Sequence, residues 1–226
     1  MSAKIQSQKG PSNVEIALAA LLSVILGVAL GAAYLVTRPV LKVKEVPKDP
    51  ASGTTYYIEG VRDSDKASDT AAKRKAFSGG ESVDVAEGEL NVFLGSLDKP
   101  DGAPPAKPNN KAPAADAKMV DVSSLNGRLH EGKIQLSDTV TFNAMGVSDT
   151  VIVQATGVFE KHGPTYEFVP DVFYIGGCPV QRLPVIRDWL LHKLLFSQPV
   201  PQDVADAWLK LSGVTIEGST LRLKMP

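Results

Sequence analysis

Residues 133–145 have the sequence KIQLSDTVTFNAM, and their alternation decides the fold of the C-terminal half of the chain. Apolar and polar side chains take turns along this stretch, apart from the polar Asp138. A period of two puts the apolar side chains on one face of a β-strand and the polar ones on the other. The stretch therefore predicts a long strand with a buried apolar face. The residues on that face are Ile134, Leu136, Val140 and Phe142.

Further strand-like runs lie on both sides of this segment and are separated by short turns. The runs are residues 125–129, 150–159 and 165–175. Glycine marks the turns, at Gly132, Gly146 and Gly163, and short turns of this kind connect antiparallel strands. Residues 119–226 are therefore expected to form an antiparallel β-meander with one buried face and a few packed helices, which is an α+β fold.

Two helices and a hairpin are expected after the last long strand. The first helix, 184–196, is apolar around most of its circumference, and such a helix must be covered by a sheet, a partner or lipid. A second helix is predicted at 201–211, and residues 214–216 and 221–225 flank a Glu217-Gly218 turn. The residues with which the first helix would face a partner or lipid are Val185, Ile186, Trp189 and Leu190.

Residues 51–97 are expected to form the N-terminal part of the same globular domain. The pattern predicts a polar, alanine-rich helix at 64–77, a short strand at 82–85 and a helix with one apolar face at 90–97. Residues 98–118 are rich in proline and alanine and contain no large apolar residue. Such a segment cannot bury enough surface to offset its ordering entropy, so it is expected to be a flexible loop.

An uncharged apolar segment, IALAALLSVILGVALGAAYLV, lies near the N-terminus at residues 16–36. About 20 apolar residues in a helix span the roughly 30 Å hydrocarbon core of a bilayer. Ser12 and Glu15 fit a capping box at its start, and Pro39 is suited to end it. The predicted segments are a tail at 1–13, a transmembrane helix at 14–37 and a juxtamembrane linker at 38–50.

The same apolar segment also has an interpretation as a cleaved signal peptide. Lys4 and Lys9 precede it, and Gly31-Ala32-Ala33 suits a signal peptidase, but its length favours an uncleaved signal anchor. The basic residues after it place the domain in the cytoplasm by the positive-inside count, whereas long domains translocate regardless of charge. We expect a single-pass membrane protein whose C-terminal domain is extracytoplasmic, in the cell envelope.

Small residues recur every four positions in this helix, at Ser23, Gly27 and Gly31. Such a stripe allows two membrane helices to pack closely, and it is therefore a candidate dimerisation face. Glycine is also common in membrane helices for which no packing role exists. Both interpretations are compatible with the sequence.

The only cysteine, Cys178, lies in the sequence FYIGGCPV at residues 173–180. Gly176 and Gly177 can take positive φ, and Pro179 restricts the backbone, so these residues suit a bend after a strand. A nucleophilic cysteine needs a neighbouring base, and structural zinc needs about four Cys or His ligands at short spacings. Neither pattern occurs in the sequence, and Cys178 is expected to be buried and unreactive.

Other chemical motifs are also missing from the sequence. It contains no phosphate-binding loop, dinucleotide fingerprint, zinc-protease motif or hydrolase nucleophile motif. A net charge of −1, without a basic cluster that carries interleaved aromatic residues, argues against nucleic-acid binding. We therefore expect no catalytic residue, cofactor or metal. A hydrolase whose residues meet only in the folded chain is the weakest of three functional hypotheses.

Residues 83–97, VDVAEGELNVFLGSL, resemble the strand-and-helix segment near the start of certain small single-pass bacterial envelope proteins, the YpmS-like and tubular lipid-binding-like kind. In those proteins an acidic-Leu-Asn element precedes long antiparallel strands, as it does here. The resemblance implies a curved sheet that cradles an acyl chain. The implied lining is Phe142, Phe159, Phe168 and Phe173. The alternative interpretation is that these phenylalanines belong to an ordinary core.

The two main hypotheses share the bilayer as a partner. In the first, a membrane-anchored, non-catalytic domain binds a partner protein or another copy of itself, as an assembly module of the envelope. In the second, a groove of the β domain carries a lipid or another hydrophobic ligand. An internal cavity of several hundred Å³ would favour the second hypothesis, and a solid core would favour the first.

Overall fold

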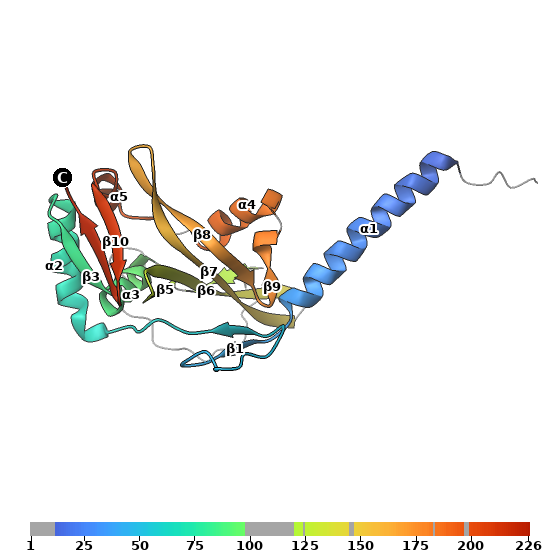
Figure 1. The fold of residues 1–226 in the computed structure, drawn as a ribbon, viewed down its shortest axis with the longest axis horizontal. Coiled ribbons are helices and arrows are strands. Elements are labelled where there is room, and N and C mark those ends of the chain that lie inside the picture. The colour runs from blue at the N-terminus through green and yellow to red at the C-terminus, as the bar shows by residue number, and fades with distance from the viewer. Residues whose placement is uncertain (1–11, 98–119, 124, 145–146, 183, 197–198) are drawn as a thin grey trace, which may run out of the picture.

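The computed structural model describes residues 12–97, 120–123, 125–144, 147–182, 184–196 and 199–226. They form the expected mixed α+β structure, in which the apolar helix α1 (Asn13–Val36) projects from a domain built on two antiparallel sheets (Figure 1). Residues 1–11 and the predicted loop 98–118 lie outside the described residues.

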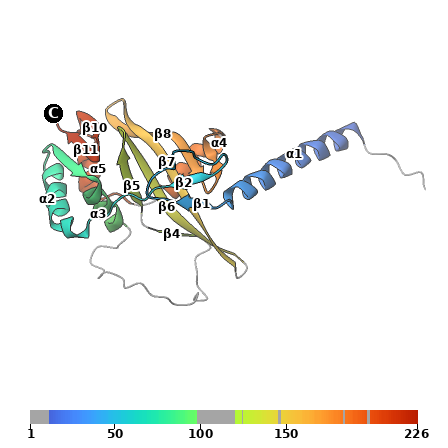
Figure 2. The same cartoon turned by 60° about the horizontal axis from the view of Figure 1, so that its bottom comes forward.

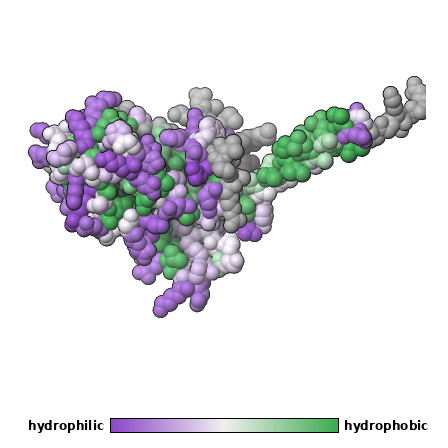
Figure 3. Space-filling view, turned by 45° about the horizontal axis from the view of Figure 1, so that its top comes forward, coloured by the Kyte–Doolittle hydropathy of each residue, from purple (hydrophilic) through white to green (hydrophobic). Residues whose placement is uncertain are grey.

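Helix α1 closely matches the predicted apolar segment. Its first turn forms the expected capping box, in which Glu15 N donates to Ser12 Oγ at 3.3 Å and Ser12 N donates to Glu15 Oε2 at 2.7 Å. No residue of α1 is buried, and Figure 3 shows a hydrophobic rod that stands off the mixed surface of the domain. Among the described residues, α1 is the one helix long and apolar enough to cross a membrane.

The larger sheet has six strands in the order β4-β6-β7-β8-β9, with β5 also paired to β6. The strands are β4 (Val120–Val122), β5 (Asn126–His130), β6 (Lys133–Ala144), β7 (Val147–His162), β8 (Thr165–Ile175) and β9 (Cys178–Pro179). All pairings are antiparallel, and the register aligns Leu136 with Ala155 and Ala155 with Phe173. These three side chains are buried, so the predicted apolar face of β6 belongs to the core.

The opposite face of this sheet is partly covered by an extended segment, which the alternation of β6 did not predict. The segment contains β2 (Thr55–Tyr57), which pairs in parallel with β1 (Val40–Lys42) inside the region predicted as a linker. Ser137 Oγ donates to Tyr57 OH at 3.2 Å, and Gln154 Nε2 donates to a backbone oxygen of the segment at 3.2 Å. Polar side chains on this face therefore bond to a covering chain, and Ser137 is buried.

A smaller three-stranded sheet, in the order β10-β11-β3, lies at the end of the domain farthest from α1 (Figures 1 and 2). Its strands are β3 (Val83–Ala86), β10 (Gly213–Glu217) and β11 (Thr220–Lys224). The other helices are α2 (Ala67–Ser78), α3 (Glu87–Leu97), α4 (Pro184–Leu194) and α5 (Gln202–Trp208), with 3-10 turns at Ser64–Lys66 and Val180–Arg182. Because β11 pairs with β3, the C-terminal hairpin closes on a strand from the N-terminal half.

A buried asparagine connects the helix α3 to the larger sheet. Asn91 of α3 is fully buried; its Nδ2 donates to Gly127 O at 2.6 Å and to Val61 O at 2.9 Å. Its Oδ1 accepts from Gly127 N at 2.6 Å. Gly127 belongs to β5, so the side-chain amide bonds to the larger sheet as a neighbouring backbone would. Asn91 is also the asparagine of the Glu-Leu-Asn element that carries the family resemblance.

The C-terminal end of α1 is attached directly to the turn between β8 and β9. Gly177 N donates to Leu35 O at 3.1 Å. Gly176 has a φ of 57°, and a Cβ at this position would overlap Val36 O. A Cβ at Gly177 would lie only 2.9 Å from Leu35 O. Both glycines are therefore needed for this close approach, and the bend predicted around them is where the domain meets α1.

Candidate functional site

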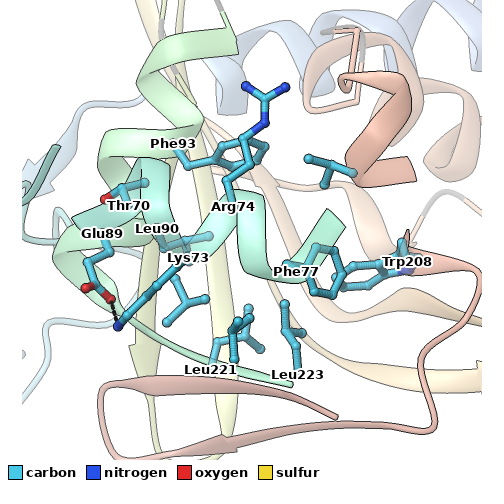
Figure 4. Close-up of a pocket in the computed structure, with 13 residues that line it drawn as sticks. Thr70, Lys73, Arg74, Phe77, Glu89, Leu90, Phe93, Trp208, Leu221 and Leu223 are labelled. Atoms are coloured by element: carbon cyan, nitrogen blue, oxygen red, sulfur yellow. Dashed lines mark hydrogen bonds and ion pairs between the residues drawn. The ribbon is translucent and has the colours of Figure 1, made fainter. Parts of the chain in front are cut away.

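An apolar pocket lies between the three-stranded sheet and the helices α2, α3 and α5 (Figure 4). The sheet contributes four aliphatic side chains, Val83, Val85, Leu221 and Leu223. The helices contribute five further apolar side chains, Phe77, Leu90, Phe93, Val204 and Trp208. Four polar residues, Thr70, Lys73, Arg74 and Glu89, complete the lining.

The apolar lining follows from the periods of the elements that supply it. Val83 pairs with Leu223 and Val85 with Leu221, so a period of two places all four side chains on one face of the small sheet. In α3, a spacing of three residues brings Leu90 and Phe93 to the same side of the helix. The pocket is therefore the partly filled space between one sheet face and three helices.

An ion pair closes one end of the pocket. Lys73 Nζ lies 2.7 Å from Glu89 Oε2 and also donates to Asp84 O at 2.7 Å. Ala86 N donates to the same carboxylate oxygen at 2.8 Å. Burial acts to raise the pKa of Glu89, but the hydrogen bonds from Lys73 and Ala86 outweigh it and hold the pKa below its usual value. The buried carboxylate thus joins α2 to the junction of β3 and α3.

This ion pair predicts that the stability of the domain depends on pH in the acid range. The pKa of Glu89 is lower in the folded than in the unfolded chain, so its contribution is present above about pH 4.5 and is lost as the pH falls further. Glu89→Gln is expected to lower the free energy of unfolding at neutral pH and to flatten its decline below about pH 4.5. Urea unfolding at a series of pH values measures both effects.

The exposed Glu81 provides the control, because Glu81→Gln removes a carboxylate just before β3 without touching the ion pair. We expect the pH profile of this variant to match that of the unaltered chain. If the Glu89 and Glu81 variants had the same profile, the ion pair would have no part in acid unfolding.

A second ion pair attaches α2 to α5. Arg74 Nη2 lies 2.9 Å from Asp203 Oδ1, and its Nε lies 3.2 Å from Oδ2, to which Ser78 Oγ also donates. The hydrogen bond from Arg74 is the main cause that lowers the pKa of Asp203. Figure 4 shows the side chains of Lys73 and Arg74 pointing in different directions from α2. Lys73 and Arg74 are consecutive residues of α2. They therefore connect this helix to two different walls of the pocket, Lys73 to α3 and Arg74 to α5.

The size of the pocket limits what it can hold. Its volume is ≈ 120 Å³, and it opens to solvent. An engineered protein cavity of about 150 Å³ admits benzene, whereas pockets that enclose drug-sized ligands measure about 300–1,000 Å³. The pocket can therefore take one apolar side chain, such as that of leucine or phenylalanine, and is too small for a whole lipid.

Of the phenylalanines implied as a lipid lining, the three whose side chains are described do not line this pocket. Phe173 is fully buried in the core of the larger sheet, and the side chain of Phe142 lies outside the described residues. Phe159 and Phe168 pack edge to face, with ring centroids 6.1 Å apart. Phe159 also packs against Trp208 at 5.4 Å. Trp208 is thus shared between this aromatic cluster and the pocket.

The residues of α4 that were predicted to face a partner or lipid differ in their exposure to solvent. Trp189 is 64% exposed, whereas Leu190 is partly buried and packs against the core. The side chains of Val185 and Ile186 lie outside the described residues. Where the structure describes it, the outer face of α4 is thus marked by one large exposed aromatic ring.

The small-residue stripe of α1 is an open surface. Ser23 Oγ donates to Ala19 O within the helix at 2.8 Å. A Cβ added at Gly27 or Gly31 would meet nothing within 4 Å. No segment of the described chain packs on the stripe, so it is available to lipid or to a second helix.

The environment of Cys178 disfavours a reactive thiolate. The residue is buried in β9, and burial raises the pKa of its thiol. Within the described part of the chain, no group of three or more His, Cys, Asp or Glu side chains could hold a metal ion. The assembled site on which a function can be argued is therefore the apolar pocket.

Comparison with known proteins gives no relative: no family model, no curated protein and no solved structure matches this chain. The family resemblance of residues 83–97 consequently stays a prediction.

Sequence reasoning missed the pocket because its walls come from four separate parts of the chain. Phe77 is a single aromatic residue at the end of a polar helix, and this was the one local signal of a contact. Leu90 and Phe93 were placed correctly on one helical face, but their neighbours were unknown. Nothing in the local pattern indicates that β3 pairs with β11.

Proposed function

We propose that this protein is a single-pass, membrane-anchored, non-catalytic module of the cell envelope that binds a partner protein. The observation that carries the proposal is an open, apolar pocket of side-chain size at the end of the domain opposite to α1 (Figure 1). An apolar side chain of the partner would fill the pocket, while α1 holds the domain at the bilayer.

The exposed apolar surface of α1 supports a role as a membrane anchor. A helix of 24 residues has a length of about 36 Å, at about 1.5 Å per residue, which exceeds the roughly 30 Å hydrocarbon core. None of its residues is buried and only its C-terminal end touches the domain, so in water most of its leucines, valines and isoleucines would be exposed. Burial in lipid removes this cost. An extracytoplasmic location of the domain remains part of the proposal.

The chemistry of the pocket supports a protein partner. Interfaces are commonly organised around a few apolar or aromatic side chains that enter preformed pockets and carry most of the binding energy. The two ion pairs hold the helices α3 and α5 on either side of α2, so the pocket exists before a partner binds. A preformed pocket lowers the entropic cost of association.

The alternative function, binding of a lipid or another hydrophobic ligand, is favoured by the apolar lining of the same pocket. Its volume favours a side chain over a lipid. Native mass spectrometry of the full chain, isolated from its own membrane, separates the two. A mass increment of a lipid that survives detergent exchange would favour the alternative.

A substitution that fills the pocket tests the proposal. Val204→Phe in α5 adds a ring to the lining and is expected to weaken partner binding about tenfold or more, because the loss of one buried apolar anchor costs about 1.5–3 kcal/mol. The measurement is crosslinking and co-isolation of the full chain from its own membrane, followed by titration with the identified partner.

Gln202→Phe is the matched control, since it adds the same ring at an exposed position of the same helix. Partner binding should survive in this variant. Equal binding by the Val204 and Gln202 variants, with both folded as judged by circular dichroism, would contradict the proposed use of the pocket.

A further inference from the structure

The base of α1 and the helix α4 lie next to each other. The β8–β9 turn contacts the end of α1 through Gly177 N and Leu35 O, and β9 then leads through the 3-10 turn at Val180–Arg182 into α4. Figures 1 and 2 both show α4 beside the end of α1 that meets the domain, on the side toward which α1 projects. A bilayer that surrounds α1 therefore comes close to α4.

The outer face of α4 carries an aromatic ring that the domain leaves uncovered. Leu191 and Leu195 attach the helix to the core and are 5% and 1% exposed. Trp189 is 64% exposed, whereas Phe196, just beyond the helix, is 39% exposed and packs against Phe168 with ring centroids 6.0 Å apart. A large aromatic side chain that the fold leaves exposed indicates a surface that meets an apolar or amphipathic environment.

Tyr34 marks the level of the lipid–water boundary. It lies in the last turn of α1 and is 63% exposed, and the guanidinium of Arg38 lies 5.2 Å from the centre of its ring. Tryptophan and tyrosine are enriched at both membrane–water interfaces, because one part of each ring is apolar and another part forms hydrogen bonds. Trp189 belongs to α4, and its ring has the same amphipathic character.

The charges around Trp189 suit the headgroup region. Arg187 pairs with Asp188 at 2.8 Å, so these two charges offset each other. His192 and Lys193 follow on the exposed part of the helix. A tryptophan beside basic residues on one side of a helix is the pattern of interfacial segments, in which the cations meet lipid phosphates.

We infer that Trp189 inserts into the headgroup region of the bilayer that holds α1, and that α4 is a second point of membrane contact. This inference rests on the proposed anchor. Two points of contact fix the tilt of the domain, so the pocket at the far end is held away from the bilayer, toward a partner.

Depth-dependent fluorescence quenching tests the inference on the full chain. The chain contains two tryptophans, so Trp208→Phe leaves Trp189 as the only one. The protein is reconstituted into vesicles of phosphatidylcholine and phosphatidylglycerol that carry a spin label either near the headgroup or deep in the acyl chain. We expect the headgroup label to remove most of the Trp189 emission, the deep label to remove less, and aqueous acrylamide to quench weakly.

A second variant keeps the test valid if Trp208→Phe disturbs the fold. Trp208 Nε1 donates to Tyr166 O at 2.8 Å, and this bond is lost in the variant. The emission of Trp189→Phe, subtracted from that of the unaltered chain, gives the Trp189 signal without changing Trp208. Trp208 itself, distant from α1, is expected to be insensitive to both lipid labels.

The outcomes separate the inference from the anchor. Protein that floats with the vesicles but whose Trp189 is quenched by acrylamide and not by lipid would overturn the inference and leave the anchor standing. Trp189 that neither lipid nor acrylamide quenches would also overturn it, because protein, such as a second copy, would then cover the ring. Protein that does not float would overturn the anchor and, with it, this inference.

Discussion

Gly176→Ala is expected to lower the free energy of unfolding by roughly 3 kcal/mol. Its φ of 57° costs any residue with a Cβ about 1–2 kcal/mol. The added Cβ also overlaps Val36 O, so the end of α1 must move away, and the bond from Gly177 N to Leu35 O, worth about 1 kcal/mol, is lost. Urea unfolding of the full chain in detergent, followed by tryptophan fluorescence, measures the change.

Gly163 in the β7–β8 turn is the matched control. Its φ is 61°, but a Cβ there would meet nothing within 4 Å. Gly163→Ala is therefore expected to lower the free energy of unfolding only by the backbone cost, about 1–2 kcal/mol. The difference between the two variants isolates the contact between α1 and the domain. Equal losses would mean that the β8–β9 turn does not hold α1.

The Gly176 variant should also lose the fixed geometry between anchor and domain. In the unaltered chain the end of α1 is bonded to the β8–β9 turn, so the domain cannot rotate freely about the segment that follows α1. In the variant, the Trp189 emission should become more sensitive to acrylamide, because α4 is no longer held beside the bilayer. This outcome connects the local contact to the orientation of the pocket.

Asn91→Leu is expected to be the most destabilising polar substitution in the domain, with a loss of about 3–5 kcal/mol in the free energy of unfolding. Leucine has a similar size but cannot bond to Gly127 N, Gly127 O or Val61 O, and all three backbone groups lose their side-chain partner. Gly127 N and Gly127 O are buried, and unsatisfied buried groups cost about 1–3 kcal/mol each. Thermal and urea unfolding both report this loss.

Asn126 gives a graded comparison. It exchanges two hydrogen bonds with the backbone of Gly60, at 2.7 and 3.1 Å, but it is only partly buried. Water can replace some of the lost bonds, so Asn126→Ala should cost about 1–2 kcal/mol. A smaller loss at Asn91 than at Asn126 would show that α3 is not held to β5 by the buried amide.

The elements with long periodic patterns were predictable from the sequence. The predicted helix at 14–37 became α1, and the runs at 133–145 and 165–175 became β6 and β8 with nearly the same limits. Each of these patterns reflects a local property: a period of two, an uninterrupted apolar segment, or a turn marked by glycine. Hydrophobic patterning of this kind acts within a few residues, and for that reason it can be seen without the fold.

The covering of the sheet was not predictable in the same way. The alternation of β6 predicted a polar outer face for the sheet. Ser137 on this face, and its neighbour Gln154 on β7, are nevertheless buried beneath the segment that contains β2. A polar residue that bonds to another part of the chain has the same local sequence as one that bonds to water. Only the position of the distant segment separates the two cases.

The sequence by itself determined the apolar helix α1, the long antiparallel strands and the glycines of the bend at Gly176, because each depends on residues that are neighbours in the chain. Only the tertiary structure decided that β3 pairs with β11 and that α2, α3 and α5 enclose a pocket. It also decided that the bend receives the end of α1. These contacts join segments far apart in the chain, and their choice depends on which surfaces are buried together in the folded domain.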